Sequence, residues 1–335
     1  MHTPAIPETM RVAVVEALTG PTALTVVDRP TPRPGPGEVL IKVGAAGINY
    51  ADVMQTRGTY VGGPRAPYVP GLEAAGTIVA LGEGAEASGR SVGERVLGVC
   101  GRSFAEYATM AAAGAMPIPP GWSDAQGAGF IVPWYTAHGC LRTVGHLKAG
   151  ETVLIHAAAG GVGQAAIKIA RHFGATVIGT VGSPEKAALA RELGAHHVID
   201  YTRQDFVAEV LALTGGRGAD LVLEMIGGET YGKNLDATRK YGRIVVYGAA
   251  SAEVASVTNV ELIFRRPVAM IGYHIVQLIA DRPDLFAEES AEIGSLIAAG
   301  VMVPSEPTAW PLARAAEALA ALEGRQTTGK LVIVP

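Results

Sequence analysis

Hydrophobic and polar positions change their pattern near residue 122 of the chain. Before that point, apolar runs rich in β-branched residues, such as RVAVVEAL, EVLIKVGAAGI, GTIVALGEG and GERVLGV, alternate with Pro and Gly clusters such as PTPRPGPGE. Short runs separated by turn-forming residues are typical of antiparallel strands joined by hairpins. The first part of the chain is therefore predicted to form a β domain.

After residue 122, apolar runs alternate with segments of helical periodicity. The runs start 21 to 25 residues apart, which is typical of β–α units that build a parallel sheet. One of the helices has clear end signals, with Ser183 and Pro184 at its start and Gly194 at its end. An α/β domain with a doubly wound parallel sheet is therefore predicted, with strands that begin at Thr152, Thr176, His197, Asp220, Arg243 and Val268.

The C-terminal part of the chain has a different order of elements. An amphipathic helix with Phe286, Ile293, Leu296 and Ile297 on one face is followed by VMVPSEPTAWP, a helix that ends at Gly324 and the strand KLVIVP. Periodicity alone leaves open whether this tail returns to the first domain.

Composition indicates a soluble two-domain protein. The chain has 335 residues, 49% of them hydrophobic, and a net charge of -4 with scattered Lys and Arg. Scattered basic residues argue against nucleic acid or an anionic membrane as a partner, so we expect a small-molecule partner. The sequence has no apolar run of about 18 residues and no signal-peptide pattern at its start, so we expect a cytoplasmic protein.

The two cysteines, Cys100 and Cys140, are too few for a disulfide framework or a four-cysteine zinc site. Each is expected to be a small buried hydrophobic residue.

A glycine-rich loop joins the predicted strand ETVLI to the predicted helix GQAAIKIARHF. Its small residues are Ala157, Gly160 and Gly163, spaced three apart. Such a loop lets the backbone approach a pyrophosphate, whose charge is stabilised by the free N–H groups of the following helix. The alternative is a tight turn between strand and helix. The position of the loop at the head of a β–α series favours dinucleotide binding.

The end of the next strand indicates which dinucleotide binds. An NAD site usually carries an acidic residue about 20 residues after the loop, which bonds the ribose 2′-hydroxyl. This chain has Val181, Gly182 and Ser183 there, and Ser183, Lys186 and Tyr201 are candidates to bind a 2′-phosphate. Alternatively, Ser183 is only a helix cap and Lys186 a solvated lysine. The pattern favours NADPH.

Several motifs in order carry a resemblance to a known family: GINYADVMQTRGTY, PGLEAAGTIVALGEG, AAAGGVGQAAIKIA, GTVGSPEKAALARELGA and HVIDY. Over nearly its whole length, the chain resembles the zinc-free quinone oxidoreductase (zeta-crystallin-like) branch of the medium-chain dehydrogenase/reductase superfamily. The resemblance implies a GroES-like, mainly β catalytic domain (1–123 and 275–335), a Rossmann NADPH-binding domain (124–274) and an active site in the cleft. Zinc-dependent relatives have a cysteine near the start of GINYADV and a histidine at the position of Leu72. Because leucine cannot bind zinc, no metal site is expected.

The resemblance also implies roles for individual residues. Asn49 would line the nicotinamide pocket and Thr136 would contact the cofactor. Tyr60 matches a proposed proton donor of related enoyl reductases, or else is only a half-buried aromatic residue. Arg325 either reaches a cofactor phosphate or is a surface arginine. The remaining positions are Gly160, Gly161 and Val162 along the pyrophosphate, Ser183, Lys186 and Tyr201 around the 2′-phosphate, and Gly248 and Ala249 near the nicotinamide ribose.

These expectations leave three hypotheses for function. The first is an NADPH-dependent quinone reductase, the second an NADPH-dependent enone or enoyl-thioester reductase, and the third a cofactor-binding protein with little turnover. In similar proteins the strand near VAMIGY pairs with its copy, so a homodimer is expected. Residues that would line the substrate pocket, or else belong to the core, are Tyr50, Met54, Tyr60, Phe130, Trp134 and Tyr273.

Overall fold

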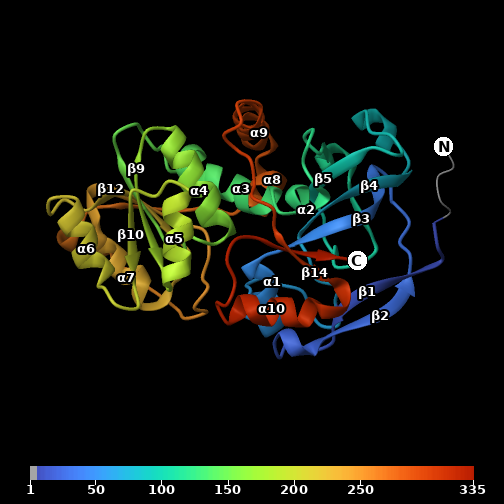
Figure 1. The fold of residues 1–335 in the computed structure, drawn as a ribbon, viewed down its shortest axis with the longest axis horizontal. Helices are drawn as coiled ribbons and strands as arrows, with labels where there is room; N and C mark the ends of the chain where they lie inside the picture. Colours follow the sequence, from blue (N-terminus) through green and yellow to red (C-terminus); the bar gives the residue numbers. More distant parts are fainter. Residues whose placement is uncertain (1–5) are drawn as a thin grey trace. The chain divides into compact units, whose positions relative to one another are not determined.

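The computed structural model describes residues 6–335. Contacts within the chain define two compact units (Figure 1). The first unit contains the chain up to Val132 together with Pro304–Pro335, and the second unit is Pro133–Val303.

The first unit is built on antiparallel strands, as its short apolar runs predict. Strand β1 (Thr9–Val15) pairs with β2 (Leu24–Pro30) as a two-stranded ribbon. Six strands of a seven-stranded sheet have the order β14-β15-β3-β4-β5-β7. The seventh, β6, pairs with the first half of β3, whereas β15 pairs with the end of β3. Its strands are β3 (Glu38–Ile48), β4 (Glu73–Leu81), β5 (Arg95–Val99), β6 (Tyr107–Ala111), β7 (Met116–Pro117), β14 (Thr308–Pro311) and β15 (Leu331–Val334).

The last part of the C-terminal tail, Pro304–Pro335, packs into the first unit. Strand β15 pairs antiparallel with β3, so that Leu331 lies opposite Ile48. Helix α10 (Ala315–Glu323) places Ala318 and Leu319 in the same core as Ile41 and other sheet residues. Residues Pro304–Pro335 of the tail therefore belong to the first unit, whereas its amphipathic helix does not. Two further helices, α1 (Tyr50–Arg57) and α2 (Asp124–Ala128), complete this unit.

The second unit contains the predicted parallel sheet. Its order is β10-β9-β8-β11-β12-β13, and every neighbouring pair is parallel. Helices α4 (Gly161–His172) and α5 (Pro184–Glu192) lie in front of the strands in Figure 1, and α6 (Phe206–Leu213) packs with α7 (Gly228–Ala237). The strands are β8 (Thr152–Ile155), β9 (Thr176–Val181), β10 (His197–Asp200), β11 (Ala219–Glu224), β12 (Thr238–Val246) and β13 (Ala269–Gly272).

The predicted strand starts are confirmed to within one residue except in β12. That strand begins at Thr238 rather than at Arg243. The pairing of β11 with β12 shifts between these two points, and Tyr241 has a φ of 60°. The extra residues form an irregular stretch, and regular pairing starts at Arg243, where the apolar run begins. The predicted end signals of α5 are confirmed, because the Ser183 hydroxyl accepts a hydrogen bond from the Lys186 N–H.

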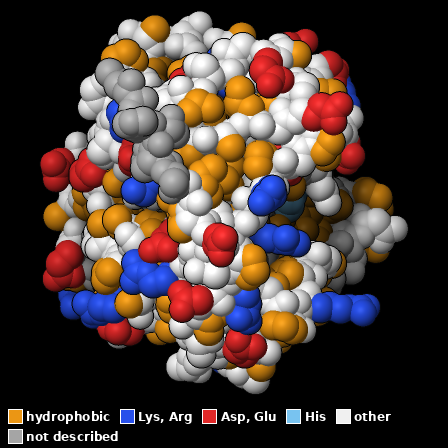
Figure 2. Space-filling view, turned by 90° about the vertical axis from the view of Figure 1, so that its right-hand side faces the viewer, with side chains coloured by type: hydrophobic (Ala, Val, Ile, Leu, Met, Phe, Trp, Pro, Cys, Tyr) orange, Lys and Arg blue, Asp and Glu red, His pale blue; other side chains and the backbone are white. Residues whose placement is uncertain are grey.

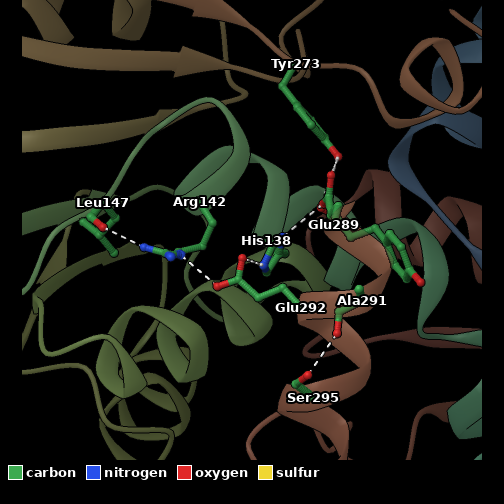
Figure 3. Close-up of polar contacts among 9 residues, drawn as sticks. His138, Arg142, Leu147, Tyr273, Glu289, Ala291, Glu292 and Ser295 are labelled. Carbon is green, nitrogen blue, oxygen red and sulfur yellow. Dashed lines mark hydrogen bonds and ion pairs between the residues drawn. The ribbon is translucent and has the colours of Figure 1, made fainter. Parts of the chain in front are cut away.

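Helix α9 (Pro283–Ala298) belongs to the second unit by its contacts. Figure 3 shows the buried carboxylate of Glu289 between two side chains from outside the helix. His138 Nδ1 lies 3.3 Å from it, and the Tyr273 hydroxyl also lies 3.3 Å away. Arg142 Nε donates to Glu292 at 3.2 Å. The compact units thus divide at Val132 and Val303, whereas the predicted boundaries lie at 123/124 and 274/275.

Cys100 and Cys140 are both buried and free, as predicted. Within the described range, no helix is long and apolar enough to cross a membrane. On the face that Figure 2 shows, Lys and Arg side chains are interspersed with Asp and Glu.

Candidate functional site

The glycine loop follows β8 and leads directly into α4. Gly160 is the residue before the helix, and no side chain caps the helix N-terminus. A Cβ on Gly163 would lie 2.4 Å from the Ala157 carbonyl oxygen, so only glycine lets the helix pack so closely on the loop. The Gln164 amide donates to the Ala159 carbonyl at 3.0 Å and holds the loop against the helix. Free N–H groups at a glycine-lined helix start fit a phosphate group.

A buried polar network lies beneath this loop, at the ends of three strands. The Glu224 carboxylate accepts hydrogen bonds from the N–H groups of Ile226 at 2.5 Å and Gly227 at 2.7 Å, and from the Asn234 amide nitrogen. Asn234 therefore turns its oxygen toward His156 Nε2, 2.8 Å away, so that nitrogen is the donor. Burial lowers the pKa of His156, which keeps the ring neutral near pH 7.

The Thr180 hydroxyl completes this network, 2.9 Å from the other ring nitrogen of His156. Since His156 follows β8, Thr180 lies in β9 and Glu224 ends β11, the network fixes the ends of these strands relative to one another. Sequence reasoning missed it, although a histidine and a glutamate that end apolar runs are the signal.

The end of β9 brings together most of the residues predicted to bind a 2′-phosphate. A Cβ on Gly182 would lie 2.6 Å from the Tyr201 hydroxyl, so this phenol lies directly against Gly182. Ser183 follows, and Lys186 stands in the first turn of α5 with its N–H 3.3 Å from the Ser183 hydroxyl. Tyr201 is 40% exposed.

A carboxylate that the sequence reasoning did not weigh stands at the same helix start. Glu185 is exposed, and its own backbone N–H and the Ser183 hydroxyl lower its pKa. The position at the end of β9 has no acid, but the helix that follows carries one next to Lys186. The signal was visible in the quoted motif SPEK.

Gly248 and Ala249 follow β12 at the same edge of the sheet. The N–H groups of Ala250 and Ser251 donate to the carbonyls of Met225 at 2.8 Å and Ile226 at 2.7 Å, so the segments after β11 and β12 run side by side. Because all six strands are parallel, the segments after β8, β9, β11 and β12 share one edge. The chain order reverses there between β8 and β11, which is where open α/β sheets bind ligands.

Three predicted residues belong to the first unit, whereas Thr136, 6% exposed on α3 (Ile131–His138), belongs to the second. Tyr60 is half-buried after α1, and burial, followed by the charge of Asp52, raises its pKa. Arg325 follows α10 and lies near Tyr50 at the start of α1, where its charge opposes the effect of burial on the tyrosine pKa. The third residue, Asn49, is part of a buried cluster.

Asn49 stands between β3 and α1, and its backbone N–H and both atoms of its side-chain amide bind acidic or basic side chains. Its N–H donates to Asp52 Oδ2 at 2.8 Å, and its amide nitrogen donates to Glu73 Oε1 at 2.9 Å. Its amide oxygen accepts from Lys330 Nζ at 2.7 Å. Burial raises the pKa of Asp52 to about 7. Glu73 and Lys330 were not predicted, although a single acid in the apolar run EAAGTIVAL is a visible signal.

The side chains near Asn49 do not fit a zinc ion. Leu72 has no donor atom, and the carboxylates of Asp52 and Glu73 are held by backbone N–H groups and by Lys330. Among residues 6–335, no three His, Cys, Asp or Glu side chains are grouped so that they could hold a metal. The donor set here is thus that of a hydrogen-bonded cluster.

Three of the possible pocket-lining aromatic residues are buried core residues, namely Tyr273, Phe130 and Trp134, the last with 4% exposure. The Tyr273 hydroxyl lies 3.3 Å from Glu289 and from the Tyr135 carbonyl, and only 6% of the residue is exposed. Phe130 is 2% exposed and packs edge-on against Trp122, with ring centroids 5.0 Å apart.

Comparisons with known families agree with this arrangement. The alcohol dehydrogenase GroES-like domain family matches residues 35–120, and the zinc-binding dehydrogenase family matches residues 161–291. The fold and the site therefore define a class of protein in which a GroES-like domain is joined to a Rossmann-like domain with a parallel sheet.

Full-length relatives place the chain more narrowly. It is 36% identical to a 2-haloacrylate reductase of a Burkholderia species, over 96% of this chain and 98% of the relative. It is 34% identical to a quinone oxidoreductase of Pseudomonas aeruginosa, over 94% and 97%. The crystal structure of Escherichia coli quinone oxidoreductase complexed with NADPH matches with a TM-score of 0.88 and 31% identity, over 97% of this chain and 100% of that one. The chain belongs to the medium-chain dehydrogenase/reductase superfamily, in its quinone oxidoreductase branch, and is an oxidoreductase.

Proposed function

We propose that this protein is an NADPH-dependent reductase that transfers hydride to quinones and similar small electrophiles without a metal ion. The observation that carries the proposal is the uncapped, glycine-lined start of α4 at the point where the strand order reverses. The E. coli relative was solved with NADPH, which supports the same cofactor here.

Bound NADPH would supply the hydride, and the chain would bind and orient the cofactor and exclude water. Asn49 and Thr136 would contact the nicotinamide end, and Arg325 a cofactor phosphate. Around the cofactor we place Gly160, Gly161 and Val162 at the pyrophosphate, Ser183, Lys186 and Tyr201 at the 2′-phosphate, and Gly248 and Ala249 at the ribose.

Substrate class follows from the donor set near Asn49. Since Leu72, Asp52 and Glu73 offer no metal site, the substrate must accept hydride without a bound Lewis acid. A quinone does so because the negative charge spreads over its oxygens and ring. Burial raises the pKa of Tyr60, the one proposed proton donor, and this makes it a weaker acid. Quinones need such a donor least.

The second candidate function is reduction of a carbon–carbon double bond conjugated to a carbonyl. It is favoured by the 36% identity to a 2-haloacrylate reductase, because a 2-haloacrylate is a conjugated acid. In that case hydride would add to the β-carbon, and Tyr60 would protonate the α-carbon of the resulting enolate.

A kinetic panel tests these alternatives. NADPH consumption is measured with quinones, enals, enones and enoyl thioesters, and the proposal expects the highest kcat/KM with a quinone. If the protein reduces conjugated alkenes but does not reduce quinones, the second function is established. NADPH binding without consumption across the panel would indicate a cofactor-binding protein with little turnover.

We further propose a cytoplasmic homodimer joined through β13. This strand ends the six-stranded sheet, and β12 is its only partner in the described chain. Large apolar side chains are exposed in the preceding segment, with Ile263 at 59% and Phe264 at 80%. Pairing with a second copy would satisfy the free edge of β13. Sedimentation should show a dimer at micromolar concentration, and a monomer would contradict this.

A further inference from the structure

A lysine from the C-terminal tail reaches the start of α1. Lys330 Nζ donates to the Ile48 carbonyl and to the Asn49 amide oxygen, both at 2.7 Å, and forms an ion pair with Glu73 Oε1 at 2.7 Å. The ammonium group therefore has two hydrogen-bond acceptors and one anionic partner. The lysine side chain is 11% exposed and the Glu73 side chain 0%.

These partners leave the Asn49 amide one orientation. Lysine only donates, so the amide atom that faces Lys330 is the oxygen. The Glu73 carboxylate only accepts, so the atom that faces it is the nitrogen, and the N···O distance is 2.9 Å. Rotating the amide by 180° would place its nitrogen against the Lys330 ammonium, so that two donors face each other. It would also place its oxygen against the Glu73 carboxylate, so that two acceptors face each other. The second N–H of the amide stays uncommitted among the described residues.

Glu73 is itself held in place from the other side. Its second oxygen accepts from the Val132 N–H at 2.8 Å. A Cβ on Gly47 would lie 2.4 Å from Glu73 Oε1, and a Cβ on Gly129 would lie 2.9 Å from Lys330 Cγ. The glycines let the backbone close tightly around both side chains, which leaves little room for them to take other rotamers.

The pairing of β15 with β3 places the lysine. Leu331, the next residue, lies opposite Ile48, the last residue of β3, in an antiparallel register. Residues that are 281 positions apart in the chain are thereby brought into contact.

We propose that Lys330 is a positioning residue for hydride transfer, acting through Asn49. Together with Glu73 it fixes the Asn49 amide so that the uncommitted N–H points toward the acceptor oxygen of the bound electrophile. A donor that is already oriented stabilises the charge that develops on this oxygen in the transition state. The inference rests on the proposed function, which assigns Asn49 to the nicotinamide end of the site, where hydride is transferred.

The test compares Lys330→Met, which keeps length without charge, with Lys330→Arg, which keeps the charge. Lys330→Met should lower kcat with a quinone about 10- to 100-fold, while KM and the Kd for NADPH stay within about threefold. Lys330→Arg should recover kcat to within about fivefold of wild type. Arg95→Met is the matched control, because Arg95 also joins a carboxylate, Asp124, to a backbone carbonyl, and it should keep kcat within about twofold.

A double variant distinguishes positioning from general damage. If Lys330 acts through Asn49, combining Lys330→Met with Asn49→Ala should lower kcat no further than Asn49→Ala alone. Multiplied losses, or a folded Lys330→Met protein with kcat within about threefold of wild type, would overturn the proposal. If Lys330→Met does not fold, the same cycle is run with Lys330→Gln.

A readout without turnover separates this inference from the proposed function. The side-chain amide signal of Asn49, assigned by its loss in Asn49→Ala, should shift or broaden in the nuclear magnetic resonance spectrum of Lys330→Met and not in that of Arg95→Met. An unchanged signal refutes positioning by Lys330. If the wild-type protein reduces no quinone while this signal shifts, the proposed substrate fails and the positioning stands.

Discussion

Replacing Lys186 with Ala should reduce the preference for NADPH over NADH by at least tenfold. Lys186 stands in the first turn of α5, where the Ser183 hydroxyl binds its N–H at 3.3 Å, next to the end of β9. A hydrogen bond between an ammonium and a phosphate contributes about 1.5 to 3 kcal/mol, which corresponds to about 10- to 150-fold in Kd. NADH lacks the 2′-phosphate, so its affinity should change little.

The neighbouring acid should act in the opposite direction. Glu185 is exposed at the same helix start, where its carboxylate would repel a 2′-phosphate. Because solvent screens exposed charges, Glu185→Gln should raise the preference for NADPH by only about two- to fivefold. Opposite effects from adjacent residues would be hard to explain by damage to the fold.

Isothermal titration calorimetry of the apoprotein with each cofactor measures these changes. All titrations use one ionic strength, because phosphate contacts are sensitive to salt. Lys148→Ala is the control, since Lys148 is exposed before β8, at the amino edge of the sheet, and carries the same charge. If the wild-type protein binds NADPH and NADH with equal affinity, the absence of an acidic residue at the end of β9 does not select NADPH, and the reasoning is refuted.

Three further predictions concern the metal, the proton and pH. Activity should survive exhaustive chelation, and elemental analysis should find no stoichiometric zinc; loss of activity with removal of a bound metal would contradict this. Tyr60→Phe should keep kcat on a quinone within about tenfold, or about 1.4 kcal/mol; a loss above a hundredfold with NADPH binding intact would favour alkene reduction. The pKa of Asp52 lies at about 7 instead of 3.8, so the folded state holds this proton more tightly. From pH 5 to 7.5, wild type should therefore lose up to about 3 kcal/mol of unfolding free energy relative to Asp52→Asn, measured with urea; parallel curves would contradict this.

Patterns that are local in sequence predicted the second unit well. The starts of β8, β9 and β10 at Thr152, Thr176 and His197 are confirmed, because a buried parallel strand needs a continuous apolar run of its own. The cap at Ser183 is confirmed for a similar reason, since its partner is only three residues away. The start of β12 was wrong because a shift in register depends on its neighbour, β11.

Contacts between distant segments could not be predicted from periodicity. An amphipathic helix such as α9 shows that it buries one face, but not that Glu289 on this face meets His138. The contacts of Lys330 could not be predicted either, because a lysine before a strand is usually exposed. The resemblance implied that the tail belongs to the first domain, but it assigned no role to Lys330 or Glu73.

The two units position their site residues by the same chemical means. In each, an asparagine amide donates to a buried carboxylate, Glu224 for Asn234 and Glu73 for Asn49, so the amide oxygen must face the other way. The charge of the carboxylate is compensated differently. Glu224 has two backbone N–H groups and a neutral His156 beyond the amide, whereas Glu73 has the ammonium of Lys330. Below the glycine loop, His156 is neutral, so that network holds no cation to offset the Glu224 carboxylate. Next to Asn49, the ammonium of Lys330 offsets the buried carboxylate of Glu73. In the proposed site, an acceptor oxygen that gains negative charge during hydride transfer would therefore be less repelled by Glu73.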